Sequence, residues 1–156
     1  MRRITCNESD RVGTWVMQQN DGATWLLGQG QCYGVEDEEG RLIAGIAFDN
    51  YNGACVQIHV AALPGKNWIS KALLHRVFSY PFHQLRVKKL IGLVGSTNAE
   101  ALRFDLALGF RIEATLKDAY PDGDLHILSM TQDQCRWLDI NLKDRSHGQE
   151  IVPSGT

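Results

Sequence analysis

The sequence has few of the features that mark secreted, membrane or metal-binding proteins. Its four cysteines form no CxxC pair and no other paired spacing, so neither a disulfide framework nor a zinc site is expected. No apolar run approaches the roughly 18 residues of a membrane span. The first ten residues carry two arginines but lack the apolar core of a signal peptide. These absences predict a cytoplasmic protein without a membrane partner.

The positive and negative charges nearly balance. Sixteen lysines and arginines face eighteen aspartates and glutamates, which gives a net charge of −2 and no case for nucleic-acid binding. His75, His83 and His126 share no ligand spacing, so no metal site is expected. The length of 156 residues suits one domain with its own core. We assign it to residues 1–142, and we expect residues 143–156 to be a polar C-terminal tail.

The clearest pattern in the sequence spans residues 89–110, KLIGLVGSTNAEALRFDLALGF, and the other expected elements are arranged around it. The apolar run 90–94 is typical of a buried strand. Asn98 can cap a helix over residues 99–108, whose apolar positions include Phe104. Gly109 stands where a left-handed residue ends a helix, and Phe110 opens another strand. The stretch therefore predicts strand, capped helix and strand.

Upstream, the pattern predicts an antiparallel meander. Residues 8–19 have the spacing of a short helix, and a short first strand over residues 2–6 is compatible with the sequence. Strands are expected over 32–36, 41–48 and 54–62, separated by glycine-containing turns. The third alternates clearly, because Val56, Ile58 and Val60 fall on one face and Gln57 and His59 on the other.

A change of period follows the meander. Residues 68–79 carry a helical apolar stripe that Pro81 ends or kinks. A helix between the strands 54–63 and 89–94 predicts that these two strands are parallel neighbours in one sheet. Further strands are expected over 110–117 and 125–130, and a short helix over 133–142. The fold class is therefore α/β (α+β), with a mixed sheet and flanking helices.

These residues resemble a known family. Asn98 and Ala101, then Leu108–Gly109–Phe110, and later Gly123–Asp124–Leu125, look like the second half of a GNAT-type N-acetyltransferase domain. The resemblance covers roughly residues 30–140. It is closest to the RimJ/RimL-like branch of the family, and similar short sequences encoded by phages make a phage one possible source. It implies a mostly antiparallel twisted sheet whose central parallel pair splays apart. It also implies acetyl-CoA as cosubstrate, an amine acceptor that the sequence does not identify, and a homodimer by analogy.

The resemblance also implies where acetyl-CoA binds. Its pantetheine arm would lie along the third meander strand, and its pyrophosphate would meet the N-terminus of the crossover helix, where free N–H groups and the helix dipole favour an anion. Asn98 either caps its helix only or also contacts the pantetheine, and Lys66 and Lys71 either add charge for the phosphates or are merely solvated. The residues assigned to the cosubstrate are Val60, Ala61, Ala62, Leu63, Lys66, Asn67, Trp68, Ile69, Ser70, Lys71, Asn98 and Phe104.

This phosphate loop departs from the family's pattern. Most GNAT domains carry Q/R-x-x-G-x-G/A before the helix, because small residues let the pyrophosphate approach the backbone. Here Trp68 and Ser70 occupy the two small positions. Serine is compatible with that role, whereas the Trp68 side chain must point away if its N–H is to donate.

The catalytic residues that the resemblance implies are His59, Gln57 and Asp105. An imidazole has an unperturbed pKa of about 6.5, so His59 is the candidate base, directly or through water. The N–H of Val60 would steady the oxyanion. Asp105 stands where many family members place an acidic tyrosine, and it can replace that tyrosine only if burial raises its pKa. Tyr80, Tyr120 or water are the alternatives.

Two functions remain open at this point. The first is acetyl transfer to a primary amine. The second is a binding or interaction protein that has the GNAT fold but has lost catalysis, as the altered loop and the missing tyrosine allow. His59 is then only a polar strand residue, and fold alone decides neither function.

Overall fold

One mixed sheet organises the computed structural model, which describes residues 2–20 and 23–139. In the described residues seven strands pair in the order β1-β2-β3-β4-β5-β7-β6. The strands are β1 (Arg3–Thr5), β2 (Gln31–Glu36), β3 (Leu42–Asp49), β4 (Cys55–Ala62), β5 (Lys89–Gly95), β6 (Arg111–Tyr120) and β7 (Gly123–Met130). The α-helices are α1 (Ser9–Gln19), α2 (Lys71–Ser79) and α3 (Ala99–Leu108).

The predicted meander is confirmed. β2, β3 and β4 are consecutive antiparallel neighbours, and β1 adds to the outer edge of β2. The turns use the expected residues: Gly40 has a φ of 80°, and the Asn52 side chain accepts the N–H groups of Ala54 and Cys55. Each strand of the meander lies within one residue of its expected bounds.

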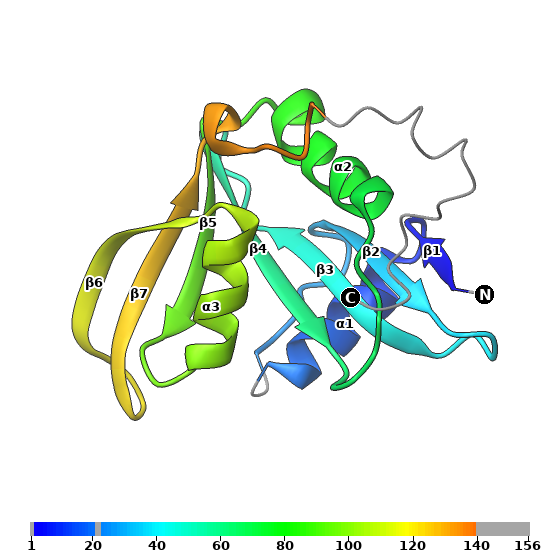
Figure 1. Ribbon diagram of the computed structural model, residues 1–156, viewed down its shortest axis with the longest axis horizontal. Coiled ribbons are helices and arrows are strands. Elements are labelled where there is room, and N and C mark those ends of the chain that lie inside the picture. The colour runs from blue at the N-terminus through cyan, green and yellow to red at the C-terminus, as the bar shows by residue number, and fades with distance from the viewer. Residues whose placement is uncertain (1, 21–22, 140–156) are drawn as a thin grey trace.

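The predicted parallel pair is also confirmed, and its two strands separate. β4 and β5 are parallel neighbours, and α2 lies between them in the chain. Their pairing covers Cys55–Gln57 and Lys89–Ile91 only. Beyond that point the two strands diverge in a V (Figure 1). We call this opening the β4–β5 gap.

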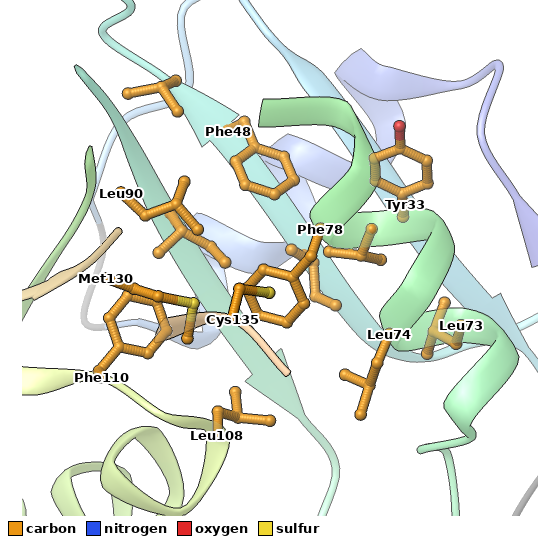
Figure 2. Close-up of a cluster of buried hydrophobic side chains, with 14 of the residues drawn as sticks. Tyr33, Phe48, Leu73, Leu74, Phe78, Leu90, Leu108, Phe110, Met130 and Cys135 are labelled. Atoms are coloured by element: carbon orange, nitrogen blue, oxygen red, sulfur yellow. The ribbon is translucent and has the colours of Figure 1, made fainter. Parts of the chain in front are cut away.

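The helices cover the two faces of the sheet separately. α1 lies behind β3 and β4, whereas α2 and α3 lie on the opposite face (Figure 1). The α1 side has a small core that includes Val12, Val16 and Ala61. The α2 side has the larger core, where Leu74 and Phe78 of α2 contact side chains of the sheet (Figure 2). Among the described residues, no helix has both the length and the apolar character that crossing a membrane requires.

The expected start of the crossover helix was wrong. The crossover helix begins at Lys71 and not at residue 68, because Ser70 is extended and its side chain caps the Leu73 N–H at 2.9 Å. The expectation that Pro81 ends or kinks this helix is confirmed, because α2 ends at Ser79 and its C-cap is Tyr80. Pro81 lies in a π-helical turn over Tyr80–Gln84, in which the Leu85 N–H donates to the Tyr80 carbonyl.

The expected helix over residues 133–142 was also wrong within the described residues. Only a 3-10 turn forms, over Gln132–Gln134, because Thr131 and Gln134 close a capping box and Cys135 is extended. Residues 140–142 and the predicted tail over 143–156 lie outside the described residues.

The last two strands form a hairpin in which the later strand is the inner one. β7 pairs with β5, and β6 pairs with β7 at the edge of the sheet. α3 has its predicted bounds and ends at Gly109, whose φ is 118°. Gly95 of β5 lies directly under the Tyr120 ring, and an added Cβ there would meet that ring at 2.4 Å. The hairpin is therefore packed against the C-terminal end of β5.

Candidate functional site

The backbone of β4 presents alternate residues to the β4–β5 gap. The Lys88 N–H donates to the Ala54 carbonyl at 2.7 Å, so the Ala54 carbonyl faces β5. Because successive strand residues alternate, the backbone groups of Ile58, Val60 and Ala62 face the same side. On the other side, the Leu63 N–H donates to the Ile43 carbonyl at 2.8 Å. Of the four strand residues assigned to the cosubstrate, Val60 and Ala62 therefore face the gap, and Ala61 and Leu63 face β3.

His59 lies between two gap-facing residues, with its side chain on the α1 face of the sheet. Its Nε2 lies 2.7 Å from Oδ1 of Asp49, the last residue of β3. The two side chains are 23% and 16% exposed, so both are largely shielded but reachable from solvent. A histidine held by a carboxylate is the usual arrangement of an oriented base.

Gln57 and Asn20 flank His59. Gln57 is opposite Asp49 in the β3–β4 ladder and alternates onto the same face as His59. Asn20 follows α1, and its side-chain Nδ2 donates to the Val60 carbonyl at 3.3 Å. The end of α1 therefore reaches the gap-facing edge of β4 beside His59.

The N-terminus of α2 offers groups that suit an anion. The Ser70 side chain accepts the Leu73 N–H. The N–H groups of Lys71 and Ala72 lie earlier in the first turn of the helix, where N–H groups have no acceptor within the helix itself. Lys66 and Lys71 are exposed beside this turn, and Gly65 has a φ of 71°. These first-turn N–H groups, the helix dipole and the two ammonium groups together fit a pyrophosphate.

Trp68 does not lie on the outer surface of this loop. Its side chain is 8% exposed and contacts Phe104 of α3, with ring centroids 5.8 Å apart. The large side chain at the first small position therefore points inward, as a donating Trp68 N–H requires. The same contact joins the α2 loop to α3. Asn67 and Ile69 beside it are half-buried.

Asp105 lies on α3, one residue after Phe104. Burial raises the pKa of its carboxyl from 3.8 to about 7. No hydrogen bond or ion pair to this carboxyl is found among the described residues, so nothing there stabilises its charged form. A carboxyl with such a pKa is half protonated near neutral pH and can donate a proton. Asp105 therefore has the raised pKa that it needs to replace the tyrosine as the acid.

Asn98 is the N-cap of α3. Its Oδ1 accepts the Ala101 N–H at 3.1 Å, and its own N–H donates to the Gly95 carbonyl at 3.0 Å. The cap is therefore real, and the side-chain Nδ2 is not needed for it. A contact with pantetheine through Nδ2 stays a prediction.

Two substitutions separate these roles of Asn98. We expect Asn98→Ala to lower the free energy of unfolding by about 1 kcal/mol, because the Ala101 N–H loses its acceptor. Asn98→Asp keeps an acceptor oxygen, so it should keep wild-type stability while losing the Nδ2 donor. Urea unfolding and the KM for acetyl-CoA of both variants are the measurements. Equal stability of the two variants would contradict the cap, and an unchanged KM in both would contradict a cofactor role.

Asp49 and Asn20 are residues of the site that sequence reasoning missed. Both lie one residue beyond an expected element: Asp49 follows the strand over 41–48, and Asn20 follows the helix over 8–19. For Asp49 a signal existed, because alternation along the β3–β4 hairpin places a residue two positions after the partner of His59 on the same face. For Asn20 no local signal existed, since its contact with Val60 spans forty residues.

Comparison with known proteins supports the fold. No protein-family model matches the chain, and a search of curated proteins gives no significant match. Solved structures do match, among them spermidine N-acetyltransferase SpeG from Vibrio cholerae in complex with CoA and spermine. That match has a TM-score of 0.65 and 16% identity, and covers 88% of this chain and 98% of the other. A manganese complex of the same enzyme matches with a TM-score of 0.64 and 18% identity, and the match covers 85% of this chain and 93% of the other.

A dodecameric structure of that enzyme gives a TM-score of 0.66 at 16% identity, over 85% of this chain and 94% of the other. Identities this low carry the fold alone. The chain thus has the mixed, mostly antiparallel fold of these N-acetyltransferases, with the separated parallel pair that the GNAT resemblance implied.

Proposed function

We propose that this chain is an acetyl-CoA-dependent N-acetyltransferase that acts on a primary amine. The observation that carries the proposal is the β4–β5 gap, with His59 beside it on the strand that borders it. Unpaired strand backbone can bind an extended ligand as an added strand would. An imidazole next to such a ligand can remove a proton from an incoming amine.

The residues fit the cosubstrate in two places. The first turn of α2, with Lys66 and Lys71, would hold its phosphates. The gap-facing backbone of Val60 and Ala62 would hold its pantetheine arm, with Asn98 and Phe104 of α3 on the other side. When bound, acetyl-CoA supplies the thioester whose carbonyl carbon the amine attacks.

Each catalytic residue has one task in this proposal. His59 takes a proton from the acceptor nitrogen as that nitrogen bonds to the acetyl carbon. The Val60 N–H donates to the acetyl oxygen and stabilises the negative charge that develops there. Asp105 returns a proton to the leaving sulfur, which its raised pKa of about 7 allows near neutral pH. Gln57 orients a water if one lies between His59 and the amine.

Fewer observations support a particular acceptor, a particular assembly or a narrower branch of the family. Spermine is bound in one of the matching structures, so polyamines are the first acceptors to test. Another matching structure is a dodecamer, so the homodimer proposed for this chain should be tested together with larger assemblies. The RimJ/RimL-like branch, a phage source, a cytoplasmic location and one domain over residues 1–142 stay predictions.

A second function is favoured by one observation. The contact between Trp68 and Phe104 lies between the α2 loop and α3, the two elements that would flank the pantetheine arm. If the Trp68 and Phe104 side chains do not separate to admit the pantetheine arm, the chain is a GNAT-fold binding or interaction protein without catalysis. Acetyl-CoA binding therefore decides between the two functions.

Stabilisation by acetyl-CoA tests the proposed function. A ligand that binds only the folded state raises the free energy of unfolding by about 2.7 kcal/mol at 100 times its Kd. We expect this increase for the wild type and a smaller one for Lys71→Glu, which puts a carboxylate beside the pyrophosphate. An acidic residue in the first turn suits the helix dipole, so this variant should fold. Denaturant unfolding with and without acetyl-CoA is the measurement.

Lys117→Glu on β6 is the matched control, because it makes the same charge change on an exposed residue of the opposite edge of the sheet. It should respond to acetyl-CoA as the wild type does. If millimolar acetyl-CoA leaves the stability of the wild type unchanged, the second function replaces the first.

A further inference from the structure

The pair formed by His59 and Asp49 has a fixed geometry. In the β3–β4 ladder His59 is opposite Ala47, and Asp49 is opposite Gln57, so Asp49 and His59 are diagonal neighbours on one face. This arrangement brings Nε2 of His59 to 2.7 Å from Oδ1 of Asp49. Because both residues belong to paired strands, the backbone holds the contact.

The carboxylate itself is held by its neighbour. Nδ2 of Asn50 donates to the same Oδ1 of Asp49 at 3.2 Å, and Asn50 is in the left-handed region with a φ of 55°. Oδ1 therefore faces two donors. A ring nitrogen that approaches such an oxygen carries the hydrogen of the bond, which places the ring proton on Nε2.

The other ring nitrogen is left for chemistry. Among the described residues, no hydrogen bond to Nδ1 of His59 is found. With Nε2 protonated, Nδ1 of the neutral ring has a free lone pair. The adjoining residues Ile58 and Val60 present their backbone to the β4–β5 gap, so the ring is one residue from the groups that would hold the thioester.

We propose that Asp49 is a positioning residue: it holds the Nε2–H of His59, so that Nδ1 is the atom that accepts the proton of the amine. This inference rests on the proposed function. The nitrogen–hydrogen bond of the acceptor breaks as its nitrogen bonds to the acetyl carbon and the carbon–sulfur bond breaks. The proton moves to Nδ1, and the Asp49 carboxylate stabilises the imidazolium that results. The imidazolium later passes the proton to water.

The first test does not depend on activity. Imidazole ¹⁵N NMR of the wild type should show the neutral His59 ring protonated at Nε2 and unprotonated at Nδ1. Asp49→Ala removes the acceptor, so the signals should move toward a mixture of both tautomers. His59→Ala identifies the signals. A wild-type ring protonated at Nδ1, or an unchanged spectrum in Asp49→Ala, would overturn the assignment whether or not the chain transfers acetyl groups.

The second test is kinetic. We expect Asp49→Ala to lower kcat about tenfold or more and to leave the KM for acetyl-CoA unchanged. In a His59→Ala background the same substitution should have no further effect, because Asp49 acts through the ring. Asp37→Ala is the matched control: this carboxylate accepts the N–H groups of Glu39 and Arg41 in the turn at the other end of β3.

The outcomes separate the two proposals. A wild-type kcat in Asp49→Ala, or an equal loss of kcat with and without His59, would overturn the role of Asp49 while acetyl transfer stands. A wild type that transfers no acetyl group to any amine would refute the proposed function instead. Far-UV circular dichroism and urea unfolding of each variant show that it is folded.

Discussion

Substituting His59 by alanine is expected to lower turnover by about 10²-fold, the lower range of what a general base contributes. His59 lies on the strand that borders the β4–β5 gap, and its ring is fixed by Asp49. The substitution removes the proton acceptor but leaves the gap-facing backbone of β4 and the first turn of α2. The Kd for acetyl-CoA should therefore equal that of the wild type, and the loss should be in kcat. Release of the CoA thiol with a polyamine acceptor is the measurement.

His83→Ala provides the matched control, because it removes an exposed imidazole from the π-helical turn after α2. Its turnover should equal that of the wild type. Full activity of His59→Ala with intact acetyl-CoA binding would show that His59 is only a strand residue. The proton would then leave through water or Gln57.

Asp105→Asn is expected to stabilise the folded protein above neutral pH and to leave its stability unchanged near pH 4. Burial raises the pKa of the folded carboxyl to about 7, from an ordinary value of 3.8. At pH values between these two, the Asp105 carboxyl is ionised in the unfolded chain and protonated in the folded chain. Wild-type stability therefore falls as pH rises. Asparagine carries no charge at any of these pH values. The gain therefore grows up to about pH 7 and then levels off, with a ceiling of about 4 kcal/mol.

Urea unfolding of both proteins across this pH range is the measurement, and Asp133→Asn is its control, because that carboxylate is exposed. A difference between Asp105→Asn and the wild type that does not vary with pH would show that Asp105 is ionised in the folded state. It could not then donate a proton near pH 7, and the acid would be Tyr80, Tyr120 or water. If Asp105 is the acid, turnover of Asp105→Asn should fall at the same time.

Local patterns in the sequence were sufficient for most elements. The bounds of α3, its cap at Asn98 and its left-handed end at Gly109 follow from residue types within one turn of each position. The meander follows from alternation and turn residues, and the parallel strands follow from a helix between two apolar runs. The start of α2 was missed because the Ser70 cap competes with an apolar stripe that continues back to Trp68.

Residue patterns predicted most of the strands and helices, their order and the parallel pair, because these depend on residues near one another in the chain. Tertiary packing alone placed β7, and not β6, beside β5, since either strand of a hairpin can pair with a neighbouring strand. Tertiary packing also placed Asp49 on His59 and Trp68 on Phe104, and it buried the carboxyl of Asp105. These features depend on contacts between separate elements, and a carboxyl's pKa depends on the solvent that those contacts exclude.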